Sequence, residues 1–393
     1  MFKKSLAAVA LLGAFAGSAF AADVTLYGVV DEGFLYTHKD ADKTDTDAVD
    51  KFELRNGIQA GSRWGLKGTE DLGNGLKVGF ILESGFNADD GTQSVSGTMF
   101  NREASLNVMG PFGQLSLGKI GAITQGTSSW GKVGAVSAFG TSYCRYATNV
   151  FAATVGVMDN TIAYQTPKFA GFTVYAQYSM GSSKAATKDS TGGGASNTQV
   201  ENESSTDRYY ALGATYANGP VNLYFAVDSV NYASYFDKNV NAVPNVDDSL
   251  TVAFGGSYDF SVVKVFAGAQ YFDEVLVGKV SGLSNVGLDL LKNKMEGYAL
   301  QASASAPLAG GTGYFGVGYV DASEADSVAA SDAFDIKYYV ASVGYKYDLS
   351  KRTNVYGVLS YAKGDQDVTT ASATVYDRKP SMVGFGIGLR HNF

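Results

Sequence analysis

The chain offers few residues of the types and spacings that catalysis requires. Its 393 residues include only two histidines, His38 and His391, so a Ser-His-acid triad or a histidine-based metal site has almost no candidates. The run 311–316 spells the Gly-x-Gly-x-x-Gly fingerprint of dinucleotide sites, and the run 113–119 approaches a phosphate-binding loop. Neither run has the strand-turn-helix setting that would give it this meaning, and we interpret both as chance matches. The sequence therefore predicts no enzyme, no catalytic residue and no cofactor.

Acidic residues and a lone cysteine are the other chemically distinctive groups. The acid-rich run 40–47 offers oxygen ligands that could bind calcium weakly, but solvated surface charge is the preferred interpretation. Cys144 is the only cysteine, so it is expected to be a sheltered thiol without a role or an intermolecular link. The sequence holds 30 basic and 38 acidic residues, a formal net charge of -8. This balance argues against a nucleic-acid partner, because phosphate binding needs a basic surface.

The first residues have the features of an export signal. Lys3 and Lys4 precede an apolar run that ends at Phe20, and residues 19–21 read Ala-Phe-Ala, which fits a small-x-small cleavage site. We therefore predict a signal peptide over residues 1–21, followed by a single domain over residues 22–393. After residue 21 no stretch reaches the roughly eighteen consecutive apolar residues that a membrane helix needs, so a helical membrane protein is excluded.

The last residues alternate strictly between two kinds of side chain. Bulky apolar side chains share one side of a strand, and small or polar side chains share the other. The apolar set is Val383, Phe385, Ile387, Leu389 and Phe393, and the opposite set is Gly384, Gly386, Gly388, Arg390 and Asn392. A strand with one face for hydrocarbon and one for water is typical of a transmembrane β-barrel wall.

About sixteen such alternating segments follow one another, joined by connections that are short and long in turn. The short connections carry tight-turn residues and lie at 71–75, 110–113, 168–171, 218–220, 259–261, 307–311 and 348–352. The long ones lie near 37–52, 89–98, 121–158, 183–206, 233–248, 274–294, 323–334 and 364–379. Connections that alternate between short and long in this way place all short turns at one end and all long loops at the other. They predict an all-β fold, a 16-stranded antiparallel transmembrane barrel with a water-filled interior.

The longest connection, 121–158, differs from the others in composition. It is poor in acid, with only Asp159 at its far edge, and it is rich in small and apolar residues. Its large side chains are Trp130, Phe139, Tyr143 and Phe151. A connection this apolar is expected to be tucked inside another part of the protein.

Motifs spread over the whole chain resemble one family. They are Val24-Thr-Leu-Tyr-Gly28, Arg63-Trp-Gly-Leu-Lys-Gly-Thr-Glu-Asp-Leu-Gly73, Asn101-Arg102, Gly110-Pro-Phe-Gly113, Leu117-Gly-Lys119, Thr161-Ile-Ala-Tyr164 and the terminal Phe393. In these motifs the chain resembles the trimeric general porins of Gram-negative outer membranes, most closely the betaproteobacterial branch. The resemblance implies a homotrimer in the outer membrane, in contact with lipid and lipopolysaccharide, and inserted by the barrel assembly machinery. It also implies that the third extracellular loop, 121–158, folds into the lumen and constricts the pore.

The same resemblance implies the residues of the constriction. Arg63 and Arg102 match wall arginines, and Glu83 matches a wall acid. The chain departs from the family pattern at three places: Met158 replaces an arginine of many relatives, Val29 replaces a basic residue of some, and Ala138 replaces a loop acid. Lys132 and Arg145 add positive charge to the loop. We therefore predict a mildly positive constriction and a weak anion preference.

Two wall positions have competing interpretations. Arg102 shares its parity with Leu106, which would turn it toward lipid; if the first strands form the trimer contact, Glu103, Ser105 and Asn107 would face outward and Arg102 inward. Lys119 is equally compatible with a pore position and with a subunit contact.

The sequence thus predicts a porin through which ions and small hydrophilic solutes diffuse passively. Two alternatives remain: a porin with a binding site for particular anions or sugars, or a surface adhesin or structural barrel with a closed pore. The terminal Phe393 resembles the aromatic signal read by the assembly machinery, so deleting it is expected to impair insertion.

Overall fold

The computed structural model describes most of the predicted mature chain. The described residues are 24–43, 46–141, 143, 149–181, 201, 206–232, 247–276, 279–280, 282–286, 294–325, 332–370 and 375–393. The predicted signal peptide, Cys144 and Arg145 lie outside this set. Within it, no helix is both long and apolar enough to cross a membrane.

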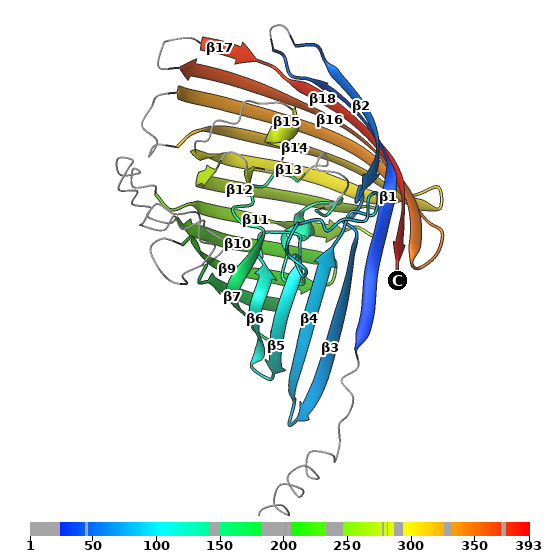
Figure 1. The fold of residues 1–393 in the computed structure, drawn as a ribbon, viewed down its shortest axis with the longest axis vertical. Coiled ribbons are helices and arrows are strands. Elements are labelled where there is room, and N and C mark those ends of the chain that lie inside the picture. Colours follow the sequence, from blue (N-terminus) through cyan, green and yellow to red (C-terminus); the bar gives the residue numbers. More distant parts are fainter. Residues whose placement is uncertain are drawn as a thin grey trace, which may run out of the picture.

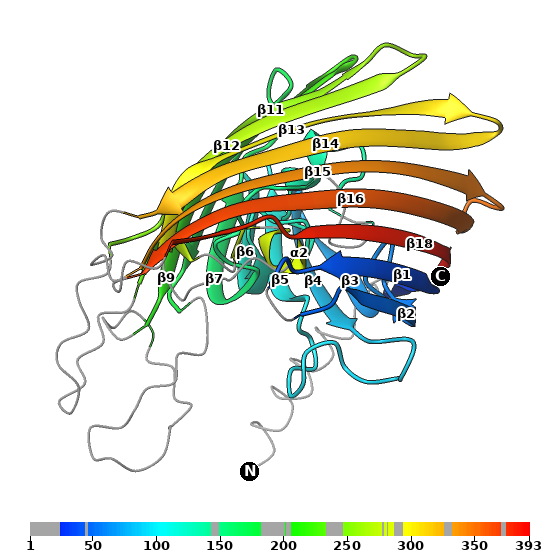
Figure 2. The same ribbon diagram turned by 90° about the horizontal axis from the view of Figure 1, so that it is seen from above.

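One antiparallel sheet winds around and closes on itself, because β1 pairs with β18 from Val29–Asn392 to Asp40–Ser381 (Figures 1 and 2). Its segments are β1 (Thr25–Asp40), β2 (Val49–Asn56), β3 (Arg63–Gly73), β4 (Leu76–Gly85), β5 (Glu103–Gly110), β6 (Gly113–Gly121), β7 (Val157–Gln165), β8 (Phe172–Ser179), β9 (Arg208–Asn218), β10 (Val221–Asn231), β11 (Leu250–Asp259), β12 (Lys264–Leu276), β13 (Lys294–Leu308), β14 (Gly311–Glu324), β15 (Asp332–Asp348), β16 (Thr353–Thr370), β17 (Val375–Arg378) and β18 (Ser381–Asn392). In the described parts of the connections there are two short helices, η1 (Val133–Val136) and α2 (Leu283–Val286).

The eighteen segments make sixteen wall strands. β2 and β3 pair with successive parts of β1, so together they form one wall strand. β17 and β18 pair with successive parts of β16 in the same way. The predicted sixteen-stranded barrel is confirmed, and each predicted short connection joins two neighbouring antiparallel strands.

The wall has two chemically different faces. Alternate residues of the strands expose large apolar side chains, such as Leu212, Phe254 and Phe315. Their neighbours along each strand point to the opposite, inner face, which carries polar side chains such as Asp228 and Gln270. The tyrosines of the wall divide between the faces: Tyr271 and Tyr361 are exposed outward, whereas Tyr175 and Tyr209 are buried.

Two predicted loops are shorter than expected, because β15 and β16 extend into them. β16 continues to Thr370 and β17 covers residues 375–378, so most of the predicted loop 364–379 is strand. In and next to these extensions the apolar side chains, such as Ile336 and Val368, are buried, and Lys337 and Lys363 point outward. A rule that places every apolar residue on the outer face therefore does not recognise these strand ends.

The last residue helps to close the barrel. Phe393 and Gly28 exchange two backbone hydrogen bonds, each with an N···O distance of 3.1 Å. The ring of Phe393 occupies the space beside Gly28, where even a Cβ atom would overlap it. The chain terminus therefore contacts the first strand with both its backbone and its side chain.

Deleting Phe393 is expected to reduce the yield of assembled barrel severalfold, because the deletion removes this closing contact and the predicted assembly signal. Heat-modifiable electrophoretic migration of membrane-extracted protein measures the assembled fraction. Phe393→Tyr is the matched control and should assemble normally. Assembly of the shortened chain at the wild-type level would contradict this prediction.

Candidate functional site

Four neighbouring strands bring a row of residues together on the inner face. The register pairs Tyr27 of β1 with Gly65 of β3, Gly65 with Glu83 of β4, and Glu83 with Glu103 of β5. Cross-strand partners point to the same face, opposite to the exposed Leu106. Gly65 is needed at its place because a Cβ atom there would overlap the Tyr27 ring. The row therefore sets two carboxylates side by side on the wall.

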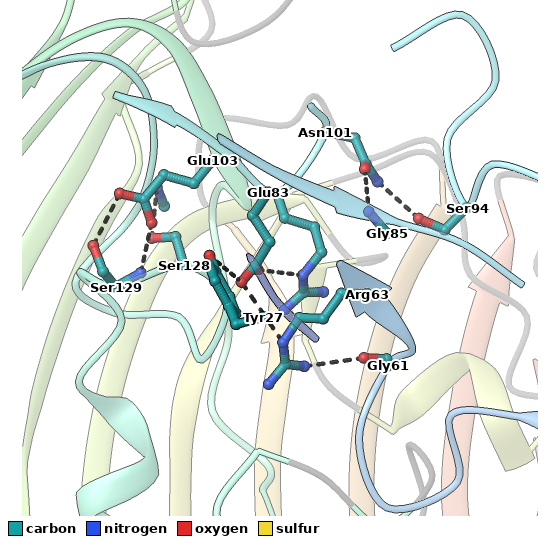
Figure 3. A network of polar contacts seen from close by, with 12 residues as sticks. Tyr27, Gly61, Arg63, Glu83, Gly85, Ser94, Asn101, Glu103, Ser128 and Ser129 are labelled. Carbon is teal, nitrogen blue, oxygen red and sulfur yellow. Dashed lines mark hydrogen bonds and ion pairs between the residues drawn. The ribbon is translucent and has the colours of Figure 1, made fainter. Parts of the chain in front are cut away.

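Glu83 is the centre of a compact charged cluster (Figure 3). Arg102 Nε donates to Glu83 Oε1 at 2.7 Å, and the Tyr27 hydroxyl donates to Oε2 at 3.0 Å. Arg63 Nε lies 3.7 Å from Oε2, and its Nη1 donates to the Gly61 carbonyl at 3.0 Å. One buried carboxylate thus holds two guanidinium groups, which leaves the group with a net positive charge. The structure brings the predicted trio Arg63, Glu83 and Arg102 together.

The predicted orientation of the residues after Arg102 is wrong. Glu103 is buried and accepts hydrogen bonds from the backbone N and Oγ of Ser129 at 2.8 and 2.9 Å, so it points inward. Ser105 and Asn107 are buried on the same face. Arg102 reaches Glu83 because it precedes β5, where strict alternation does not yet apply; its backbone N donates to the Glu83 carbonyl at 3.2 Å.

A cavity of about 480 Å³ separates this cluster from residues 126–129 of the connection between β6 and β7. Two of its lining residues, Lys67 and Arg390, are basic side chains that we did not single out from the sequence. The alternation nevertheless indicated them: Lys67 shares the parity of Arg63, and Arg390 lies on the polar face of the last strand. Four basic side chains, Arg63, Lys67, Arg102 and Arg390, line the cavity with two acids, Glu83 and Glu103.

The other predicted basic residues have separate positions. Lys132 lies in an adjoining cavity, where its Nζ donates to the Ser129 carbonyl at 2.9 Å and lies 5.4 Å from the centre of the Tyr175 ring. Burial lowers the pKa of Lys132 from its ordinary value. Lys119 forms an ion pair with Asp159 at 2.5 Å. Arg145 is outside the described residues.

Three wall glutamines bind the backbone of the segment between β6 and β7. Each side-chain amide accepts a hydrogen bond from one N–H of this segment and donates one to a carbonyl, at distances from 2.6 to 3.3 Å. The pairs are Gln177 of β8 with Ile123 N and Gly121 O, Gln270 of β12 with Ala152 N and O, and Gln301 of β13 with Val150 N and Val136 O. The amides act as a neighbouring strand would, and they satisfy backbone groups that are shielded from water.

A buried aspartate joins the two ends of the same segment. Asp228 of β10 accepts hydrogen bonds from the hydroxyls of Thr124 at 2.6 Å and Thr154 at 3.1 Å. The wall hydroxyls of Tyr209 and Thr251 donate to it at 3.0 and 2.6 Å. Asp228 therefore fixes both ends of the segment to the wall through hydrogen bonds.

Wall glycines leave room for the apolar side chains of this segment. A Cβ atom at any of four inner-face glycines would lie 2.6 to 2.9 Å from such a side chain, closer than packing allows. The pairs are Gly213 with Ile123, Gly255 with Val136, Gly268 with Phe151, and Gly318 with Val150. The large side chains Trp130, Phe139, Tyr143 and Phe151 of this segment are all buried, so the segment packs against the rest of the protein.

None of the three residues that depart from the family pattern lines the cavity beside Glu83. Val29 and Met158 are buried, and Ala138 donates its backbone N–H to Ser303 Oγ at 2.8 Å. None of them supplies a charge, so the charge of the cavity depends on the residues described above.

Known proteins resemble this chain over its full length. The Gram-negative porin family matches residues 7–367. An outer membrane porin protein of Bordetella pertussis is 33% identical, and outer membrane porin protein 32 of Delftia acidovorans is 31% identical; each alignment covers 100% of both chains. Among solved structures, an anion-selective porin from Comamonas acidovorans superimposes with a TM-score of 0.64 at 26% identity, covering 95% of this chain and 100% of that one.

Three observations agree on the same family: the barrel with alternating short and long connections, the charged cluster on its inner wall and these sequence and structure matches. On this evidence the chain belongs to the family of Gram-negative outer-membrane porins.

Proposed function

We propose that this outer-membrane channel lets ions and small hydrophilic solutes diffuse passively, with a weak preference for anions, through a constriction between residues 121–158 and the wall at Arg63, Glu83 and Arg102. The observation that carries the proposal is the excess of basic side chains around the cavity of about 480 Å³. Fixed charge in a narrow passage with low-dielectric walls raises the local concentration of the opposite ion.

The contacts of the segment between β6 and β7 support a constricting role. Its backbone is bound by inner-face glutamines of β8, β12 and β13, and Asp228 of β10 binds both of its ends. On another side of the barrel, Tyr143 accepts a hydrogen bond from Gln59 at 2.8 Å and packs edge-on against Tyr356 of β16. Contacts with inner-face residues of strands so far apart around the ring support a path across the interior.

The anion preference has two supports. The described charges that line the cavity comprise four cationic and two anionic side chains. The similar structure from Comamonas acidovorans is described as an anion-selective porin. Pairing with Glu83 moderates the field of Arg63 and Arg102, so we expect the selectivity to be weak rather than exclusive.

We also propose a homotrimer whose contact lies on the outer face of the first strands. Phe34 of β1 and Phe52 of β2 stack there with ring centroids 5.7 Å apart and remain exposed, together with Leu26 and Leu54. This apolar patch would be shielded in a trimer of the kind that the family suggests.

The double substitution Arg63→Gln/Arg102→Gln is expected to lower the chloride-to-potassium permeability ratio by about twofold or more, because it removes two fixed positive charges. Glu83→Gln should raise the same ratio. Reversal potentials of single channels in a planar bilayer under a KCl gradient measure both changes. Lys363→Gln, an exposed and outward-facing position on β16, is the control and should leave the ratio unchanged.

Clear cation selectivity of the wild type at neutral pH would reject the anion preference. A purified protein that produced no conductance steps would instead favour a closed surface barrel. Block of the current by one anion or sugar at low concentration would favour a channel with a specific binding site.

Replacing Gln270 by Leu should loosen the constricting segment, because the volume is kept while both hydrogen bonds to Ala152 are lost. Leaving these backbone groups unsatisfied costs about 1–3 kcal/mol. We expect frequent brief transitions between conductance levels in single-channel recordings. Gln93→Leu, an exposed position between β4 and β5, is the matched control. A current as quiet as that of the wild type would show that this tether does not hold the segment.

A further inference from the structure

The outer ends of β15 and β16 have the opposite polarity to the rest of the wall. Nearer the middle of these strands, Val343 and Leu359 are exposed outward, and the inward-facing Ser342 and Ser360 hydroxyls lie 2.8 Å apart. Toward the long connections the inward side chains become apolar and buried, and the outward ones become charged. The inward set is Phe334, Ile336, Tyr338, Val340 and Val368, and the outward set is Asp335, Lys337, Lys363 and Asp367.

An apolar inner lining would be unfavourable if it bordered a water-filled mouth. The buried state of these side chains requires another part of the protein to cover them. The cover includes α2, whose Leu283 and Val286 are fully buried in the same apolar cluster as Tyr338 and Met382.

The position of α2 is unusual for its place in the chain. It lies in the connection between β12 and β13, which are neighbours in the sheet, yet it contacts β16 and β18. Wall strands are about 4.8 Å apart, so four strand spacings separate β13 from β18 by about 19 Å along the wall. Gly282, just before α2, lies against the ring and hydroxyl of Tyr338, where a side chain would not fit. The connection therefore leaves its own hairpin and reaches the far wall, and Figure 2 shows α2 within the outline of the barrel.

The start of this connection is attached to the segment between β6 and β7. Val280 forms an isolated antiparallel bridge with Ala152, and the Ala153 N–H donates to the Lys279 carbonyl at 2.9 Å. Ala152 is itself held by Gln270. The described residues 279–280 and 282–286, here called the mouth segment, thus run from the constricting segment to the inner wall of β15–β18.

We infer that the mouth segment closes the side of the outer mouth next to β13–β18 and confines permeation to the side lined by Arg63, Glu83 and Arg102. This inference rests on the proposed channel function and adds a second determinant of pore size. The charged cluster sets which ions pass, and the mouth segment sets how wide the entrance is. Because its contacts with the wall are apolar and fully buried, the segment is a fixed part of the entrance.

The double variant Leu283→Ser/Val286→Ser removes the apolar contacts that hold the mouth segment against the wall. We expect single-channel conductance to rise by about 1.5-fold or more, and larger neutral sugars to enter in liposome-swelling assays, because the entrance widens. The chloride-to-potassium permeability ratio should stay at the wild-type value, since the charged cluster is untouched. The matched control is Val95→Ser/Met99→Ser, which makes the same kind of change at two exposed positions between β4 and β5.

Heat-modifiable migration first establishes that each variant forms a barrel. If the double variant does not assemble, Leu283→Ala provides a milder test, for which we expect a smaller rise in conductance in the same direction. An assembled variant with wild-type conductance and a wild-type size limit would overturn the inference and leave the proposed function intact. A wild-type protein without conductance would overturn the proposed function and this inference together.

Discussion

The structure depends on one constraint: a backbone N–H or C=O group inside a membrane must be bonded to another group of the protein. A sheet meets this constraint only when it closes, because an open sheet leaves two edges unpaired. Here the closing seam is the pairing of β1 with β18, which extends to the contact between Gly28 and Phe393. In the closed sheet one face of every strand points toward lipid and the other toward the interior. Residues that alternate along a strand therefore meet lipid and water in turn.

A closed barrel of this width cannot fill its interior with the side chains of its own wall. The segment between β6 and β7 packs against the inner face, and three kinds of contact hold it there. Amide side chains pair with its backbone, a buried carboxylate binds hydroxyls at its two ends, and wall glycines accept its apolar side chains. The hydrogen bonds satisfy polar groups that are shielded from water, and the packing shields apolar side chains from water. The charged cluster around Glu83 lies opposite this packed segment and keeps its polar groups toward the cavity.

Most of the wall could be predicted from the sequence, because alternation and turn chemistry are local properties. The sixteen strands and the partnership of Arg63, Glu83 and Arg102 followed from pattern and resemblance. The alternation of Glu103, Ser105 and Asn107 by itself indicates the inner face, and the assumption of a subunit contact at this strand gives the wrong orientation. The roles of Gln270 and Asp228 could not be predicted, since they depend on which distant backbone groups meet each side chain in three dimensions. The inverted ends of β15 and β16 could not be predicted for a related reason: where protein covers the inner face, the apolar residues of the alternating pattern point inward instead of outward.

The glutamine tethers have a consequence for how such channels can diverge. Gln177, Gln270 and Gln301 bind only backbone atoms of the segment, and Ser303 likewise accepts from the backbone of Ala138. The side chains of the segment are therefore not needed for these bonds. Natural variation could exchange an acid for an alanine at a position such as Ala138 and alter the charge of the segment, while the path of the segment stayed the same. Placement and charge can thus evolve separately in this protein.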